Sequence, residues 1–291
     1  MGVFARSWEI TKLSFDVIKK DRELLLFPLL GGLFSLLFIV ALLVPTLITS
    51  FIKGQQTYGT EEYLIIFAIY FGLVFIATFF NVCVVYTTKI RFAGGNATFN
   101  ESIKFALSKI HLILSWSLLS ATVGLILRMI DNLAEKAGKG GEIILRIINM
   151  ILGMLWSIIT IFVVPSMVYH DLGPIDAIKK SVEVLRKTWG ESLIRYYGLG
   201  LIQFLFLLLG VVIGVPLFLI LSSIGVFGII AALSILTVYF IGTILVFSVA
   251  NGVFNTALYV YADTGKVPKG YNKEIMTNAF QTKKSRTQGL I

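Results

Sequence analysis

Six long apolar stretches constrain this chain more than any other feature. They run from about 24 to 52, 63 to 88, 112 to 130, 143 to 169, 194 to 221 and 229 to 262. A helix needs roughly 20 mostly apolar residues to cross the core of a bilayer, so each stretch predicts a membrane span. With 57% hydrophobic and only 14% charged residues, the chain carries more apolar surface than a water-soluble globule buries. We therefore expect an all-α, polytopic membrane helix bundle of six transmembrane helices, and we exclude a soluble enzyme.

The last two stretches are open to two interpretations. From Tyr196 to Ala262 the chain runs for 67 residues without a charge, which is about 100 Å of helix. That length accommodates two long tilted spans or three short ones. Pro216 and the stretch 222–225 are the places where a helix is expected to break, and residues 216–232 could also form a re-entrant segment.

The distribution of charge favours six spans. Residues 1–23, 89–111, 170–195 and 263–291 together hold 20 of the 25 Lys and Arg, but only 11 of the 16 Asp and Glu. Six spans place these four segments on one side of the membrane, and positive segments face the cytoplasm. We expect a protein of the cell membrane with both termini in the cytoplasm and the whole net charge of +9 on the inner face. Such a face attracts anionic lipid headgroups, and it does not require nucleic acid.

Three similar segments precede the first, third and fifth stretches. Each holds a serine (Ser14, Ser102 and Ser181) within a basic amphipathic segment that leads into an apolar run. A basic amphipathic helix next to a membrane lies in the interface, so we predict about three cytoplasmic interfacial helices and three parallel repeats of two spans. The repeats cover about 1–90, 91–170 and 171–262 of a single transmembrane domain, 1–262, followed by a basic cytoplasmic tail, 263–291. Chance likeness among hydrophobic sequences is the alternative.

Helical spacing predicts which face of each segment is apolar. In the first segment the face consists of Phe4, Trp8, Thr11, Phe15 and Ile18. In the second it consists of Phe99, Ile103, Ala106 and Ile110, and in the third of Ile175, Ile178, Val182, Leu185 and Trp189.

Two motifs resemble known sequences. The stretch GPIDAIKKSVEVLRKTWGESL (173–193) resembles a recurring motif of prokaryotic multispan proteins, among them the membrane domain attached to some glycerophosphodiester phosphodiesterases. The ending FNTALYVYADTGKVPKGYNKEIMTNAF (254–280) is similar to the C-terminus of an uncharacterised prokaryotic six-span family. The resemblance implies an integral membrane protein, and it brings no catalytic or binding residue with it.

Polar residues inside the spans are the candidates for a site. Ionisable residues are absent near the span centres, which argues against proton-coupled or voltage-sensing machinery. Asn251 and Asn255 share a face of the sixth span, and Asn81 lies in the cytoplasmic half of the second. They form either a polar pocket that opens inward or hydrogen bonds between helices.

Other motifs are weaker. Gly210 and Gly214 form a small-xxx-small motif for helix packing, within the chain or between protomers. The single cysteine, Cys83, excludes an intrachain disulfide and a cysteine-based metal site. His170 and Asp171 are adjacent but lack a partner for acid–base chemistry, so we expect no catalytic residue, metal or cofactor.

These observations leave three hypotheses for function. The first is a protein without catalytic activity that organises lipids or a membrane partner complex, with Lys179, Lys180, Arg186 and Lys187 as contacts for anionic lipid. The second is a permease or channel for a small solute. The third, a lipid-modifying enzyme, has no catalytic constellation in its favour. A protein partner or a second copy of the chain fits the first two.

Overall fold

The computed structural model describes residues 3–53, 60–189, 198–271 and 276. Within these ranges the chain is helical and contains no strand. The all-α fold class is therefore confirmed.

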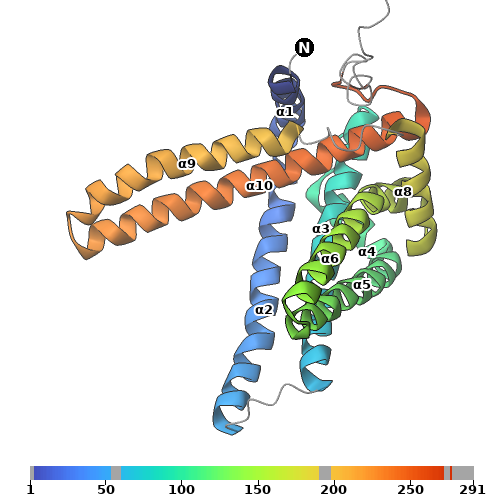
Figure 1. Cartoon of the computed structure of the whole chain (residues 1–291). Helices are drawn as coiled ribbons and strands as arrows, with labels where there is room; N and C mark the ends of the chain where they lie inside the picture. Colours follow the sequence, from blue (N-terminus) through green and yellow to red (C-terminus); the bar gives the residue numbers. More distant parts are fainter. Residues whose placement is uncertain (1–2, 54–59, 190–197, 272–275, 277–291) are drawn as a thin grey trace, which may run out of the picture. The chain divides into compact units, whose positions relative to one another are not determined.

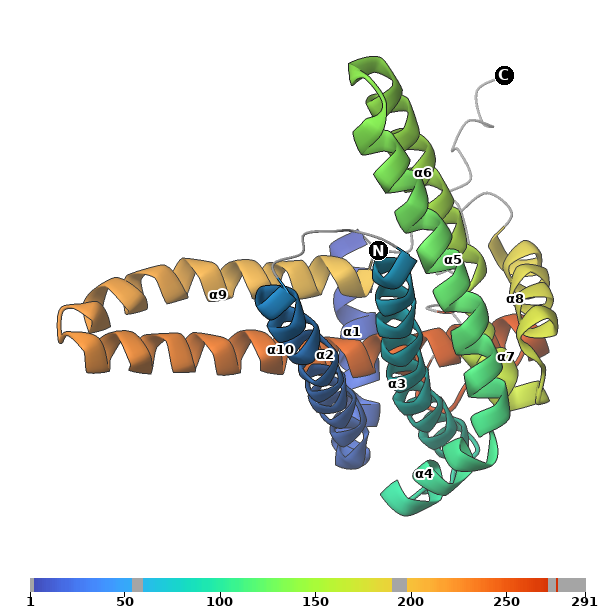
Figure 2. The same ribbon diagram turned by 90° about the horizontal axis from the view of Figure 1, so that it is seen from below.

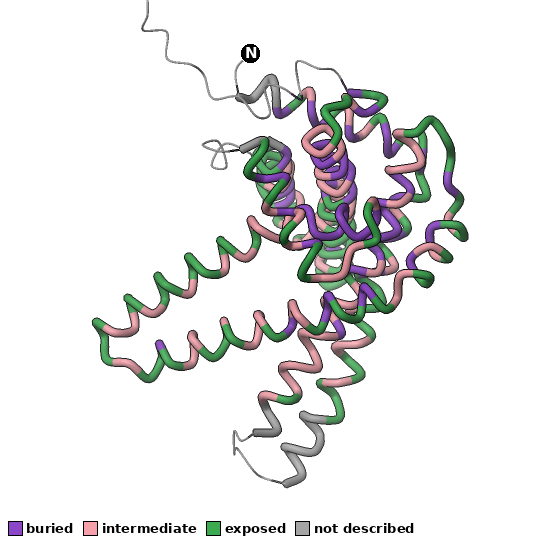
Figure 3. Tube along the Cα trace, turned by 90° about the vertical axis from the view of Figure 1, so that its right-hand side faces the viewer, coloured by how far each residue is buried: buried purple, intermediate pink, exposed green. Residues whose placement is uncertain are grey.

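The predicted spans correspond to long helices. They are α2 (Leu26–Lys53), α3 (Thr60–Phe92), α5 (Ile110–Lys136), α6 (Lys139–Ile159) with α7 (Val163–His170), α9 (Gly198–Ser222) and α10 (Val226–Thr264). Among the described residues, six helical stretches are long and apolar enough to cross a membrane, and they coincide with the six predicted ones. At most 28% of the most apolar part of each stretch is buried. Exposed and intermediate residues follow one another along these helices (Figure 3), so their surfaces need lipid rather than water as the solvent.

The fourth span is broken shortly before a proline. Pro165 has no N–H to donate to Ile161, and its ring clashes with a helical carbonyl at that position. The helix accordingly stops at Ile159 and resumes at Val163. At the break, the backbone N–H of Phe162 donates to the Ser181 hydroxyl at 3.2 Å.

The uncharged stretch forms two helices rather than three. Helix α9 continues through Pro216, and the break falls at residues 223–225. Gly225 adopts a φ of 89°, and a Cβ at Gly228 would collide with the backbone of Leu221, so glycine is required at both positions of this turn. Helices α9 and α10 then run side by side in opposite directions (Figures 1 and 2).

The three amphipathic segments are also helical: α1 (Val3–Lys20), α4 (Phe99–Ser108) and α8 (Pro174–Trp189), with a short 3-10 helix, η1 (Arg22–Leu25), after α1. Helix α4 begins with a capping box in which Thr98 and Glu101 bond to each other's backbone N–H groups. The N–H of Thr98, together with its hydroxyl, lowers the pKa of Glu101.

In two of these helices the residues that are buried in the protein differ from the predicted apolar face. In α1 the buried residues are Ser7, Ile10, Thr11, Ser14, Val17 and Ile18, whereas Trp8 is 40% exposed. In α8 they are Ala177, Ser181, Val184 and Leu185, whereas Ile175 is 64% exposed. An apolar face of an interfacial helix is expected to lie in the acyl boundary, so the exposure of Trp8 and Ile175 does not contradict the predicted faces, which stay a prediction. Trp189 lies outside the residues whose side chains are described.

The chain divides into two compact units, each described by itself. The first comprises Met1–Leu25, Thr88–Asn96 and Arg186–Ile291, and the second comprises Leu26–Thr87 and Ala97–Leu185. In the first unit α1 packs against α9 and α10, with Phe247 between Phe15 and Phe206 at ring distances of 5.5 and 5.6 Å. In the second unit α5 and α6 form an antiparallel hairpin (Figure 2).

Candidate functional site

A cavity of about 390 Å³ lies in the second unit, among α3, α5 and α6. Ligand sites for small molecules measure about 300–1,000 Å³, so its volume is within that range. Its lining combines two charged side chains with hydroxyl, aromatic and aliphatic groups. The lining residues are Tyr70, Val74, Ser120, Gly124, Leu127, Arg128, Asp131 and Trp156.

Helical spacing brings the lining residues together. Five of them lie on α5 at steps of four, three, one and three residues, from Ser120 to Asp131, so they share one face of the helix. Tyr70 and Val74 are one turn apart on α3, and Trp156 belongs to α6. Gly124 allows α3 to approach, because a Cβ there would lie 3.2 Å from the Tyr70 ring.

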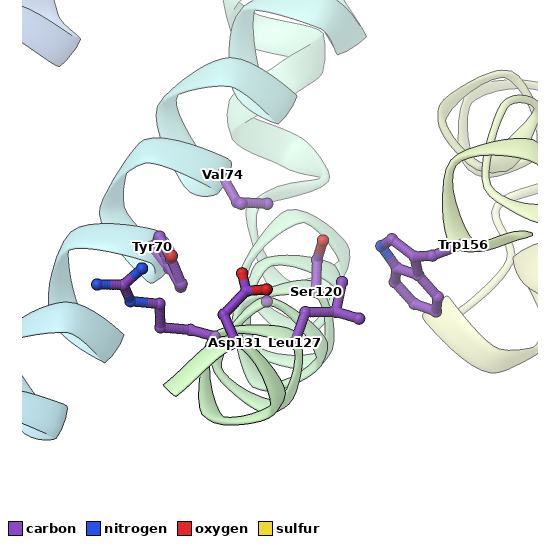
Figure 4. A pocket seen from close by; sticks show the side chains of 8 residues that line it. Tyr70, Val74, Ser120, Leu127, Asp131 and Trp156 are labelled. Atoms are coloured by element: carbon purple, nitrogen blue, oxygen red, sulfur yellow. The ribbon is translucent and has the colours of Figure 1, made fainter. Parts of the chain in front are cut away.

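One end of the cavity is charged. The Asn149 side-chain amide donates to Asp131 Oδ1 at 2.6 Å, which holds in place a carboxylate that lines the cavity (Figure 4). The other carboxylate oxygen has no hydrogen-bond partner among the described residues. Arg128 lies three residues before Asp131 and has no ion-pair partner in the described part of the chain. The site therefore offers one cation and one carboxylate oxygen to a ligand.

The other end of the cavity is aromatic. Trp156 stacks on the buried Trp116 at a ring distance of 5.8 Å and an angle of 10°, and Figure 4 shows its ring across the cavity from Val74. From Ser120 to Asp131 the two ends are about 16 Å apart along α5. Polar groups at one end and apolar groups at the other suit an amphiphilic ligand.

The predicted asparagines lie in different units. Asn81 is exposed on α3 in the second unit, whereas Asn251 and Asn255 are half-buried on α10 in the first. A pocket formed by all three would join both units, and it stays a prediction.

The predicted lipid contacts lie along α8. Lys179, Arg186 and Lys187 are exposed and Lys180 is half-buried. Lys179 pairs with Asp176 at 2.9 Å, and Lys180 pairs with Glu183 at 3.6 Å. Both are pairs between residues three apart on a helix surface, a type of interaction that contributes little to stability.

The predicted glycine motif lies against α10. A Cβ at Gly210 would collide with Tyr239, and one at Gly214 would collide with Leu236. The Tyr239 hydroxyl also donates to the carbonyl of Phe206 at 2.7 Å. The absence of side chains at the two glycines thus permits the close approach of α9 and α10.

The cavity was missed by sequence reasoning. Arg128 and Asp131 lie near the end of a span, so their charges alone do not mark them as a site. The signal that could have found the cavity is the face of α5 that carries both charges together with Ser120 and Gly124. Trp156 and Asn149 belong to α6, and nothing in the sequence places them opposite particular residues of α5.

Six long, apolar and exposed helices among the described residues define a multi-pass membrane protein. The model of a family of unknown function, DUF6159, matches residues 60–269. The match covers more than half of the chain, so the chain belongs to this family, as the similarity of its ending to an uncharacterised family led us to expect. No curated protein matches the chain.

Proposed function

We propose that the protein organises lipids of the cell membrane without catalytic activity, with both termini in the cytoplasm. The observation that carries the proposal is the arrangement of α8, which buries Ala177, Ser181 and Val184 and exposes basic side chains. The resemblance of 173–193 to the membrane domain of some glycerophosphodiester phosphodiesterases stays a prediction.

The exposed basic residues suit anionic headgroups. Helix α8 carries four basic residues against two acidic ones, and each Lys or Arg near an anionic surface contributes about 1 kcal/mol of attraction. The pairs of Lys179 and Lys180 with their acidic neighbours are partly exposed, so a phosphate can replace the carboxylates at low cost.

The test is the lipid that the purified protein retains. Replacing Lys179, Lys180, Arg186 and Lys187 by glutamine should remove bound phosphatidylglycerol, measured by native mass spectrometry. The matched control replaces Lys136, Lys139 and Arg146, which the predicted topology places on the other face, and should retain it. Equal retention by the two variants would refute the proposal.

The topology has its own test. Single cysteines at Lys139 and Lys266, with Cys83 replaced by serine, are exposed to a membrane-impermeant thiol reagent on intact cells. Only the cysteine at 139 should react. Labelling at 266 would contradict cytoplasmic termini.

A permease for a small solute is the alternative. The half-buried Asn251 and Asn255, one turn apart on α10, favour it. If it holds, Asn255→Leu should lower solute flux in vesicles without lowering expression, whereas Asn81→Leu should do the same only if all three residues line one path.

A further inference from the structure

The cavity among α3, α5 and α6 holds a pair of opposite charges that do not bond to each other. Arg128 and Asp131 both line it, and no ion pair joins them. From this geometry we infer that the cavity binds a zwitterionic phospholipid, with the phosphate at Arg128, the ammonium at Asp131 and an acyl chain directed toward Trp156. This site uses other residues than the basic face of α8, so it stands or fails separately from the proposed function.

The guanidinium of Arg128 is the phosphate contact. A cation in a membrane helix is costly unless it has a counter-ion or reaches the headgroup region, and the described residues supply no counter-ion. Arginine donates two parallel N–H bonds to a phosphate. On the predicted topology Arg128 lies about 12 Å from the outer end of α5 at Lys136, which is a depth that a lipid phosphate reaches.

The carboxylate of Asp131 is the contact for the positively charged ammonium group of the ligand. Its Oδ1 is already bonded to Asn149, so the carboxylate is held in place and its other oxygen is available to an ammonium group. A ligand with a phosphate alone would be attracted by Arg128 and repelled by Asp131. A ligand with both charges is attracted by both residues. The pair therefore favours a zwitterionic ligand over an anionic one.

The remainder of the lining is suited to a chain. Val74, Leu127 and the Trp156 ring line the cavity beyond the charged end, and Gly124 lets the Tyr70 ring pack closely against α5. Burial of methylene groups along this length strengthens binding in proportion to the apolar area removed from water. A free zwitterion would leave this part of the cavity unoccupied.

The experiment measures binding of lauroyl lysophosphatidylethanolamine to the full chain in nonionic micelles, by native mass spectrometry. Arg128→Gln should weaken binding about tenfold or more, because a charge-assisted bond is lost. Arg146→Gln is the matched control, since Arg146 lies on α6 outside the cavity and pairs with Glu142 at 3.0 Å. It should leave binding unchanged. Equal effects of the two variants would overturn the inference.

Two further ligands test the two parts of the site one at a time, the carboxylate of Asp131 and the apolar part of the lining. Lauroyl lysophosphatidylglycerol, which lacks the ammonium, should bind the wild type more weakly, and Asp131→Asn should remove the difference between the two lipids. Water-soluble phosphoethanolamine should bind more weakly than the lysolipid. If it binds equally well, the cavity belongs to a soluble zwitterion and the lipid assignment is wrong.

A variant that alters the shape of the cavity tests the site without removing a charge, and its folding is measured separately. Gly124→Leu adds a side chain that must displace the Tyr70 ring within the lining of the cavity, and it should abolish lysolipid binding while Arg128 and Asp131 remain. The elution volume and melting temperature of each variant are measured alongside. Undiminished binding by a folded Gly124→Leu variant would show that the lipid binds elsewhere.

Discussion

Removal of Arg91 should destabilise the first unit far more than removal of an exposed arginine. Both the Nε and one Nη group of Arg91 donate to the carboxylate of Asp21, which lies between α1 and η1. The same Nη donates to Asn96 Oδ1 at 2.6 Å. The Asp21 side chain is 5% exposed and that of Arg91 is 24% exposed, so the pair is largely shielded from solvent.

The burial of the two partners sets the size of the effect. Arg91→Met leaves a buried carboxylate without its counter-ion, and breaking a buried pair in this way costs about 3–5 kcal/mol. Asp21→Asn leaves the more exposed partner, which keeps its bond to Asn96, so we expect a loss of about 1–3 kcal/mol. The double variant removes both charges and should be more stable than the sum of the two losses predicts, because neither charge is then left buried and unpaired.

Equilibrium unfolding in mixed micelles, followed by circular dichroism, gives the free energies of unfolding for this cycle. Arg146→Gln is the control, since its pair with Glu142 is about half exposed and should contribute less than about 1 kcal/mol. Additive losses in the double variant, or equal losses for Arg91→Met and Arg146→Gln, would refute the account of a buried and coupled pair.

Three further predictions follow from single contacts. Tyr271→Phe should lower the free energy of unfolding by about 1–2 kcal/mol, because the buried Ser14 hydroxyl, 3.0 Å from the Tyr271 hydroxyl, loses its partner; Ser14→Ala in the same background should add little. Ser181→Ala should cost about 0.5–1.5 kcal/mol, because the N–H of Phe162 loses the hydroxyl that accepts its hydrogen bond, and a melting temperature equal to that of Ser108→Ala, an exposed serine, would contradict this. The lowered pKa of Glu101 means that the capping box stabilises α4 above the ordinary pKa of a glutamate, and that this is lost as the pH falls through the lowered value. Amide hydrogen exchange in α4 should therefore speed up in acid, once corrected for its intrinsic pH dependence, and Glu101→Gln should flatten this response.

The spans could be predicted because hydropathy depends on the sequence alone. An apolar run of sufficient length requires a helix in lipid whatever its neighbours are, so the six stretches were located without knowledge of their packing. The break between α9 and α10 fell at the glycine-containing stretch rather than at Pro216, since a proline in a membrane helix is tolerated where the freed carbonyl finds other partners. Glycine alone permits the φ of 89° at Gly225.

Packing between helices could not be predicted in the same way. The apolar residues of α1 and α8 cover more than one face, and the sequence does not tell which of them meets protein and which meets lipid. Trp8 and Ile175 belong to the predicted apolar faces and are exposed, whereas the faces buried in the protein contain the small residues Ser7, Ala177 and Ser181. In lipid the apolar side chains gain little from burial in protein, so close contact between small residues determines the interface.

The three serines of the predicted repeat illustrate this rule. Ser14, Ser102 and Ser181 are each fully buried. Ser102 bonds to Thr87, near the end of the second span, at 2.7 Å, and Ser181 accepts from Phe162 in the fourth. Ser14 bonds to Tyr271, seven residues after the sixth span ends at Thr264. Each amphipathic helix thus uses its serine to bond to a two-span pair: near the end of the second span, at the break within the fourth, and after the end of the sixth. The three segments correspond in this use of the serine. This correspondence supports the proposed threefold repeat, because a duplicated unit would reproduce the contact together with the residue that makes it.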